Sequence, residues 1–238
     1  VPIGLFNGML HPFVGFPIKG AIWYQGETNA SRYRSYPELF KAMHREWNKV
    51  WECGDFPIYF CQIAPHKEPE KAAKAFMREA QMYIAQTQPR TGIAVLTDAG
   101  ELTCVHPANK CVAGERLAYI ALARDYGYQN LAYEGPIFKE AVFKEGGKAV
   151  ASFDKVGLGF STFGQPLTGF ELAGEDRKFY PAEASINRYN RTIEVVSDKV
   201  EHPVAVRYAF KGYVNGTLFG SNGLPVSSFR SDKWDDVE

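Results

Sequence analysis

The sequence lacks the features that point most directly to a membrane or a nucleic-acid partner. No apolar run reaches the roughly 18 residues that a membrane-spanning helix requires. Lys plus Arg and Asp plus Glu each number 27, so the chain has no net charge with which to attract nucleic acid or an anionic membrane. Hydrophobic residues make up 45% of the chain and charged residues 23%, which is typical of a folded globular protein. We therefore expect no nucleic-acid partner and no membrane partner.

Cysteine is scarce, and its spacing is wrong for a metal site. The four cysteines are Cys53, Cys61, Cys104 and Cys111, and no two of them form a CxxC pair. Structural zinc sites commonly use such pairs, so we expect no metal and no cofactor. Cys61 lies in an apolar strand pattern and Cys111 in a helical one, which favours buried free thiols, although one disulfide is compatible with the sequence.

Up to about residue 130, short apolar strand patterns alternate with amphipathic helical patterns. The expected elements are strand 18–25, helix 36–51, strand 58–64, helix 72–87, strand 92–97 and helix 109–125. The first strand pattern is apolar enough to predict a buried strand. Strands and helices of these lengths in alternation predict a parallel sheet with helices on both faces.

Two of the helices can be predicted in more detail. Ser35, followed by Pro37 and Glu38, predicts an N-terminal capping box for the first helix. Helical spacing also predicts which apolar side chains face the core. They are Leu39, Phe40, Met43, Trp47, Val50 and Trp51 in the first helix, and Phe76, Ala80, Tyr83 and Ile84 in the second.

After residue 130 the helical patterns disappear. Short alternating segments at 149–153, 182–186, 192–196 and 204–208 are separated by turn residues, which indicates antiparallel β-structure. We predict two domains, an α/β domain over residues 1–130 and a β-rich, sandwich-like domain over residues 131–238.

Polar clusters follow each of the three predicted parallel strands, where ligands bind in open α/β sheets. His106 lies on the loop after the third strand, and its pKa range near neutrality suits a general base. Pro107 stiffens the backbone behind it. An ordinary surface-loop histidine is the alternative. The remaining histidines are expected to be structural, except His66, which follows the second strand and is expected to border the pocket.

The loop after the first strand contains Gln25, Gly26, Glu27 and Asn29. A glycine there allows a sharp turn, the Gln25 amide can donate to a developing oxyanion, and Glu27 can accept hydrogen bonds from a substrate. The alternative is an ordinary loop with polar capping residues.

Several segments resemble the successive blocks of sialate O-acetylesterases, a group of SGNH-type hydrolases that also resembles certain acetylxylan esterases. They are "IKGAIWYQGETNA", "GDFPIYFCQIA", "REAQ" and "DAGELTCVHPANKCVAGERLAYIALA", followed by "LTGFELAG", "FYPAEASI", "PVAVRYAF" and "LFGSNGLPVSSFRSD" from a β-rich tail. The WYQGE and HPANK blocks in this order form a specific signal. The resemblance implies part of an SGNH, flavodoxin-like parallel sheet followed by an antiparallel β-rich domain.

The resemblance also implies an activity. Such enzymes hydrolyse acetyl esters on sugars, here sialic acid, by attack of a serine whose proton a histidine accepts. His106 matches the family's catalytic histidine, and Gln25 matches the position that donates to the oxyanion. The predicted catalytic residues are His106, Gln25 and Asp98, and the predicted substrate-binding residues are Glu27, Asn29 and His66. An acetylxylan esterase and a non-catalytic carbohydrate-binding module are the alternatives.

Two departures from the family pattern affect these predictions. Residues 1–22 contain no serine, and the Gly-Ser-Asn at Ser221 lacks the strand-to-helix context of a nucleophile elbow. We therefore expect an N-terminal segment absent from this chain to supply the serine. Many relatives have Asp three residues before the histidine, where this chain has Thr103. Either Asp98 or Glu101 then orients His106, or the enzyme uses a Ser–His dyad.

The expected compartment also comes from the resemblance. Sugar-ester hydrolases of this family are secreted, which implies a periplasmic or extracellular location. The first residues of the sequence show no basic segment and no cleavage site, so no signal peptide is visible in them.

Overall fold

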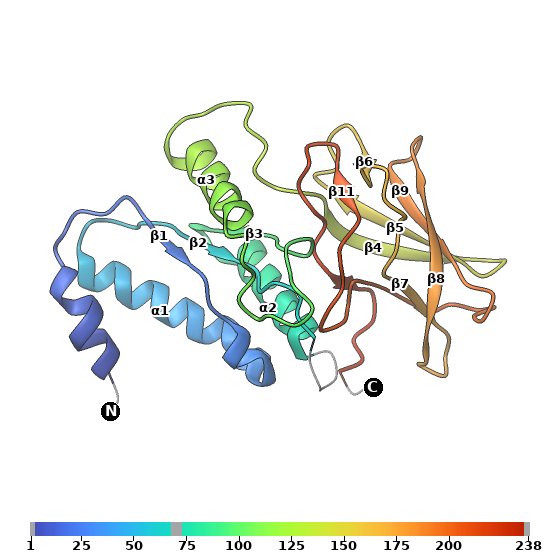
Figure 1. Cartoon of the computed structure of the whole chain (residues 1–238), viewed down its shortest axis with the longest axis horizontal. Coiled ribbons are helices and arrows are strands. Elements are labelled where there is room, and N and C mark those ends of the chain that lie inside the picture. Colours follow the sequence, from blue (N-terminus) through green and yellow to red (C-terminus); the bar gives the residue numbers. More distant parts are fainter. Residues whose placement is uncertain (1–2, 68–72, 236–238) are drawn as a thin grey trace.

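The computed structural model describes residues 3–67 and 73–235 of the chain. An α/β part and a β-rich part lie side by side (Figure 1). This confirms the predicted fold class, a parallel sheet with flanking helices followed by antiparallel β-structure. The α/β part ends with helix α3 at Asp125 and strand β4 begins at Ile137, so the predicted boundary at residue 130 lies between these elements and stays a prediction.

The α/β part is built on a small parallel sheet with the strand order β1-β2-β3. The strands are β1 (Ala21–Trp23), β2 (Ile58–Cys61) and β3 (Thr91–Ala94). Each strand is shorter than predicted, because regular ladder pairing stops where the chain turns into the loops at the sheet edge. Ile22 is 74% exposed, so the prediction that the first strand is buried is wrong for this residue.

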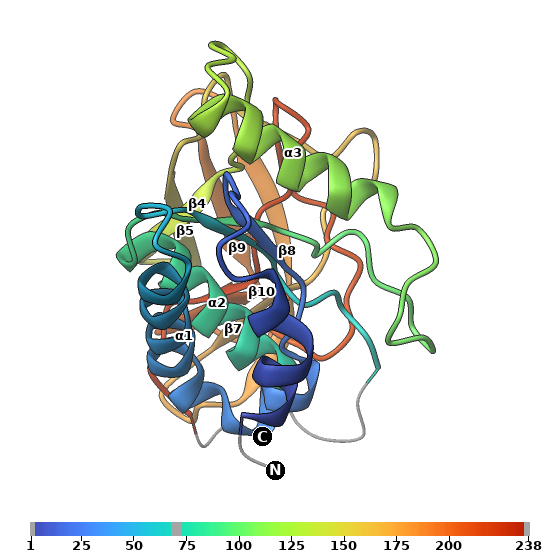
Figure 2. The same cartoon turned by 90° about the vertical axis from the view of Figure 1, so that its left-hand side faces the viewer.

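Helices cover both faces of this sheet (Figure 2). On one face α1 (Tyr36–Trp51) and α2 (Ala73–Thr87) pack against Ile58 and Phe60. On the other face α3 (Cys111–Asp125) packs against Tyr59 and Cys61. Successive side chains of β2 point to opposite faces of the sheet and therefore pack into two separate hydrophobic cores. Ala72, the predicted start of the second helix, lies outside the described residues.

Three local predictions are wrong. Two short helices precede β1, namely η1 (Phe6–Leu10) and η2 (His11–Phe13). A third helix, η3 (Glu27–Ser35), follows β1 and continues into α1. Ser35 is consequently helical itself and donates its hydroxyl to the carbonyl of Arg32 at 3.0 Å instead of capping α1. Leu39 and Tyr83 are 57% and 56% exposed, because the sheet covers only part of each helix.

The β-rich part contains one seven-stranded antiparallel sheet with the order β12-β10-β7-β8-β9-β5-β4. Its strands are β4 (Ile137–Lys144), β5 (Lys148–Asp154), β7 (Phe170–Ala173), β8 (Phe179–Asn187), β9 (Thr192–Val196), β10 (Ala205–Tyr208) and β12 (Phe229–Arg230), and β6 (Phe160–Ser161) pairs with β11 (Phe219–Gly220). The rings of Phe138 on β4 and Phe229 on β12 stack with centroids 4.1 Å apart. The two outer strands are thus in contact, which gives the sheet a barrel-like curl.

Helix α2 joins the two parts. Arg78 is completely buried and donates to the Ser228 hydroxyl at 3.0 Å and to the carbonyls of Ala209 and Lys211. Arg230 forms a two-point ion pair with Glu79, with both distances 2.8 Å. Polar residues of α2 are therefore buried by the second part of the molecule, which the amphipathic pattern alone did not predict.

The cysteines and the membrane prediction can be compared directly with the structure. All four cysteines are free, but only Cys61 is buried. The expected burial of Cys111 is wrong, because Cys111 begins α3 on its exposed side. Within the described residues, no helix is both long and apolar enough to cross a bilayer.

Candidate active site

All six predicted site residues lie on the loops that follow the three parallel strands, at the end of the sheet where the strands' carboxyl ends meet. These residues are Gln25, Glu27 and Asn29 after β1, His66 after β2, and Asp98 and His106 after β3. The carboxyl ends of parallel strands form the usual ligand-binding edge of an open α/β sheet.

The turn after β1 depends on Gly26. Its φ of 153° lies in a region that other residues rarely adopt, and a Cβ atom there would lie 2.7 Å from Ile63. The buried side chain of Gln81 fills the space below this turn. Its nitrogen donates to the Gln25 carbonyl at 3.2 Å, and its oxygen accepts from the backbone N–H of Ile63 at 2.8 Å. Gln81 therefore joins the loops after β1 and β2.

The side-chain amide of Gln25 is held at both ends. Its oxygen accepts from the Tyr36 hydroxyl at 3.1 Å, and its nitrogen donates to Asn29 Oδ1 at 2.7 Å. The Tyr36 hydroxyl in turn accepts from the Trp23 ring nitrogen at 3.2 Å. Because the oxygen faces Tyr36, the NH₂ group faces the loop, and one of its two hydrogens has no partner among the described residues. The structure thus brings Gln25 and Asn29 together.

Glu27 begins η3 next to Gln25 and is half-buried. Its carboxylate forms no hydrogen bond or ion pair with any residue in the ranges 3–67 and 73–235. It is therefore available to accept hydrogen bonds from a ligand at this edge.

The loops after β2 and β3 are in direct contact. A Cβ atom on Gly100 would lie only 2.1 Å from the carbonyl oxygen of Pro65, so only glycine fits there. The Lys67 N–H donates to the carbonyl of Leu102 at 3.0 Å. These backbone contacts fix the start of the segment that carries His106.

The His106 loop is closed by the Glu101 carboxylate, which accepts from the backbone N–H of Ala108 at 2.6 Å. Pro107 is buried, whereas His106 is exposed. In the described part of the chain, the His106 ring has no hydrogen-bonding partner. The loop therefore holds the backbone of His106 and leaves its imidazole open to the sheet edge.

Among the described residues, no hydrogen bond joins Asp98 to His106. Both of its carboxylate oxygens accept from the Arg116 guanidinium of α3 at 2.7 Å, and Arg116 also donates to the carbonyl of Val95 at 2.6 Å. This two-point pair is only slightly exposed. In this geometry Asp98 ties the end of β3 to α3 rather than orienting an imidazole.

His66 belongs to a different local arrangement. Its Nδ1 lies 2.7 Å from the Lys74 ammonium, and its backbone N–H donates to the carbonyl of Gly212 in the β-rich part at 3.1 Å. With the Lys74 ammonium as the donor, Nδ1 is the acceptor of this hydrogen bond. His66 borders the edge but no hydrogen bond joins it to His106 in the described residues.

A cation–π contact connects the first and third loops. The Lys110 ammonium, just after the His106 loop, lies 5.0 Å from the ring centre of Tyr24. Burial raises the pKa of Tyr24 to about 12, with smaller contributions from Cys61 and Glu27. Gln25 and His106 therefore lie on neighbouring loops, although no hydrogen bond links their side chains among the described residues.

No nucleophile is paired with a base in the described part of the chain. Ser221 lies in the turn after β11, in the β-rich part, and is exposed. Burial raises the pKa of the Cys61 thiol to about 12, against a lowering effect of Lys110, so this thiol stays protonated at neutral pH. The described residues also contain no group of three or more His, Cys, Asp or Glu side chains that could hold a metal ion.

Sequence reasoning missed two side chains that organise the site. Tyr36 orients the Gln25 amide, and Gln81 supports the loop from α2. The position of Tyr36 in the first turn of α1, directly after the polar loop, was the only signal for it. Gln81 belongs to the REAQ segment that resembles the family, but no role was predicted for it, because its role depends on the packing of α2 against the sheet.

Comparisons with known proteins show which proteins this chain resembles. A carbohydrate acetylesterase from Xanthomonas citri has a similar structure, with 41% sequence identity and a TM-score of 0.87 over 97% of this chain and 54% of that one. The sialate O-acetylesterases of Mus musculus and Homo sapiens are 28% and 29% identical over 57% and 56% of this chain. No protein-family model matches.

These relatives are longer than the chain. It spans about half of the solved acetylesterase and 29% of each curated relative. The resemblance predicted from the sequence is confirmed: this chain is related to sialate O-acetylesterases and, over nearly its whole length, to a carbohydrate acetylesterase.

Proposed function

We propose that the complete protein is an SGNH-type carbohydrate O-acetylesterase that removes acetyl groups from sialic acid. The esterase names of the relatives support the general reaction class. The observation that carries the proposal is the orientation of Gln25. Its oxygen is bound by Tyr36 and one NH₂ hydrogen by Asn29, which leaves the second NH₂ hydrogen open on the loop next to the one that carries His106.

This arrangement suits acyl transfer. His106 accepts the hydroxyl proton of a serine while the serine oxygen attacks the acetyl carbonyl carbon. The Gln25 amide donates to the oxygen that becomes negative in the tetrahedral intermediate. When the intermediate collapses, the imidazolium returns the proton to the sugar oxygen that leaves. Water then repeats the cycle on the acetyl-enzyme and releases acetate. Glu27, Asn29 and His66 border the sugar.

We infer that the serine belongs to a segment absent from this chain, and the two edges of the parallel sheet support this. At the β3 edge, Arg116 and Arg124 of α3 donate to the outward carbonyls of Val95 and Thr91. Within residues 3–67 and 73–235, β1 pairs only with β2, and Ile22 on it is largely exposed. An uncovered strand edge is normally avoided, so a further segment of the protein would complete the sheet here.

We propose that His106 works in a Ser–His dyad, in which no carboxylate orients the imidazole. Asp98 is fully engaged with Arg116, and Glu101 accepts from the backbone of Ala108. Both carboxylates thus position the loop instead of contacting the imidazole. Asp98 and Glu101 are positioning residues in this proposal, and His106 works with the incoming serine alone.

The compartment and the alternatives stand as follows. A periplasmic or extracellular location fits a substrate of acetylated glycans. An acetylxylan esterase would use the same site chemistry on a polymer. A non-catalytic carbohydrate-binding module would not need an oriented amide beside an exposed histidine, and this favours the enzyme.

The test compares this chain with the complete protein on an aryl acetate. We expect this chain to hydrolyse the ester no faster than its own His106→Ala variant, because it lacks the nucleophile. The complete protein should hydrolyse the ester and be labelled by a fluorophosphonate on a serine outside this chain. Labelling of a serine within residues 1–238, with activity lost in step, would falsify the proposal.

A further inference from the structure

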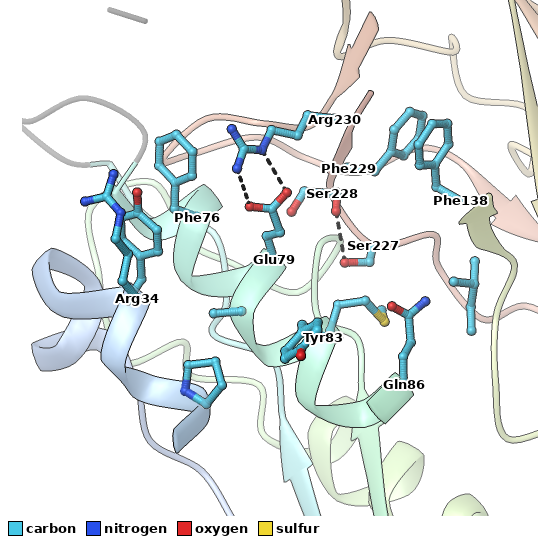
Figure 3. A pocket seen from close by; sticks show the side chains of 15 residues that line it. Arg34, Phe76, Glu79, Tyr83, Gln86, Phe138, Ser227, Ser228, Phe229 and Arg230 are labelled. Carbon is cyan, nitrogen blue, oxygen red and sulfur yellow. Dashed lines mark hydrogen bonds and ion pairs between the residues drawn. The ribbon is translucent and has the colours of Figure 1, made fainter. Parts of the chain in front are cut away.

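A cleft of about 400 Å³ lies between α2 and the β-rich part (Figure 3). We call it the α2 cleft. Its walls include Tyr33 and Phe76 on one side and Phe138 and Phe229 on the other, and Tyr83 stands at its mouth. None of the six predicted site residues lines it. Its volume lies within the range of about 300–1,000 Å³ that is typical of small-molecule sites, which also favour boundaries between folded units.

The α2 cleft continues into a second cavity. This neighbour has a volume of about 380 Å³ and shares Met82, Gln86 and Ile137 with it. It extends along α2 to Tyr133 and Arg124. Two adjoining cavities offer room for a ligand of more than one sugar ring.

The aromatic rings of the α2 cleft differ in how much surface they leave open. Tyr33 stacks on Phe76 with ring centres 4.9 Å apart, and Phe138 stacks on Phe229 at 4.1 Å. The Arg34 and Arg230 guanidinium groups lie over Tyr33 and Phe76, and Phe76 and Phe229 are buried, so Tyr83 is the ring with the most open surface. The Tyr83 side chain is 56% exposed although it lies on the face of α2 where an amphipathic helix would bury an apolar residue. Sugar rings present flat C–H faces that pack on aromatic rings, so such surfaces suit saccharides.

The charged groups of the cleft cancel one another. Arg230 binds both Glu79 and Asp235 at 2.8 Å, and Arg34 binds Asp235 at 3.1 Å. Arg230 also lies 3.8 Å from Asp232, which pairs with Arg207 at 2.7 Å. Among the described residues three cations therefore face three anions, and no charge is left over to attract an anionic ligand. The ligand chemistry that matches is neutral.

Polar groups remain available for hydroxyl groups. Each Glu79 oxygen accepts one hydrogen bond from Arg230 and has a further lone pair. The Gln86 amide, exposed at the junction of the two cavities, has no hydrogen-bonding partner among the described residues and offers both donor and acceptor. Figure 3 shows Glu79 and Gln86 on the same side of α2 as Tyr83. An exposed aromatic ring beside neutral donors and acceptors suits a saccharide.

We propose that the α2 cleft binds a neutral oligosaccharide chain, the part of a glycan that carries the acetylated sugar. This inference rests on the proposed carbohydrate function but concerns a separate site. The cleft would hold the polymer or glycan at a distance from His106, so binding there would not require ester hydrolysis.

The test is titration of the complete protein, followed by NMR or calorimetry, with xylotetraose and lacto-N-tetraose as neutral probes and 3′-sialyllactose as the anionic one. We expect at least one neutral probe to bind with a dissociation constant of about 0.1–3 mM. Tyr83→Ala and Gln86→Ala should each weaken binding at least about threefold. Tyr189→Ala, which alters a tyrosine that is 96% exposed in the β-rich part, is the control and should change nothing.

Three results would overturn the proposal: no binding of either neutral probe, binding that neither cleft variant weakens, or tighter binding of sialyllactose than of both neutral probes. Binding by this chain that disappears in the complete protein would also overturn it, since the rest of the protein would then cover the cleft. Melting curves identify a variant that fails to fold, and Gln86→Ala, on an exposed position, then decides. Loss of aryl-acetate hydrolysis would count against the proposed function and leave the binding result standing.

Discussion

The loops that carry Gln25 and His106 lie at the same edge of the sheet but are held in opposite ways. The Gln25 side chain is fixed at both ends by Tyr36 and Asn29. The His106 loop is fixed through its backbone by Glu101, and its imidazole has no partner among the described residues. A preorganised amide can stabilise an oxyanion without rearranging. A base becomes useful only once its nucleophile lies beside it. In the proposed mechanism this chain therefore holds the oxyanion donor already oriented, whereas the base still lacks its nucleophile.

The largest effect is expected when the imidazole of His106, the proposed base, is removed. In the complete protein, His106→Ala should lower kcat by at least ~10³, because only oxyanion stabilisation and binding remain without a general base. His202→Ala, at an exposed histidine of the β-rich part, is the matched control and should retain full activity. Steady-state kinetics on an aryl acetate measure both. A loss under tenfold for His106→Ala would mean that the base lies elsewhere.

The second-largest effect on kcat is expected when the Gln25 amide, the proposed oxyanion donor, is removed. Gln25→Ala in the complete protein should lower kcat by roughly 10² to 10³ with KM nearly unchanged, because the interaction forms mainly in the transition state. Gln25→Glu should be at least as damaging, since a carboxylate places negative charge where negative charge develops. Gln165→Ala, at an exposed position in the β-rich part, serves as the control. A stable Gln25→Ala enzyme with near-normal kcat would end the oxyanion assignment.

A smaller effect tests whether the amide is preorganised. Tyr36→Phe removes the hydroxyl that holds the Gln25 oxygen and should lower kcat by about tenfold, because the amide then samples other orientations. Combining it with Gln25→Ala should add almost nothing, since the two act as one unit. Tyr208→Phe is the control, because its hydroxyl binds the backbone of Leu218 away from the site. If the two losses of kcat were fully additive in the double variant, Tyr36 would act independently of Gln25.

The smallest effect on kcat is expected at Asp98. Asp98→Ala should cost about 2–4 kcal/mol of stability, because the nearly buried Arg116 loses its partner, while kcat per folded molecule stays within about threefold. Denaturant unfolding and kinetics on the same samples separate the two. A large fall in kcat in a stable variant would show that Asp98 orients His106 after all, in favour of a triad.

Local regularity explains what could be predicted. The first helix spans the predicted residues 36–51, because its apolar side chains recur at helical spacing over four turns. Strand β9 also matches the prediction at residues 192–196. Strands β4 and β7 were missed, because β4 is half exposed on both faces and β7 is short and buried. Neither shows the clear alternation on which a single sequence depends.

Which loops lie together was easier to predict than which side chains contact one another. The six predicted residues all follow parallel strands, and chain order alone places such residues at one edge. Which side chains bind one another was not visible. Asp98 and Arg116 are 18 positions apart, and Gln25 and Gln81 are 56 positions apart, so their contacts depend on how α3 and α2 pack.

The sequence by itself determined the alternation of strands and helices, the change to β-structure after residue 130, and the loops that carry Gln25 and His106. These features depend on local periodicity and on glycine and proline at turns. Only the tertiary structure decided that Tyr36 orients Gln25, that Arg116 binds Asp98, and that α2 forms one wall of an aromatic cleft. Such contacts join residues that are distant in the chain, and their energies depend on burial and direction, which no local pattern encodes.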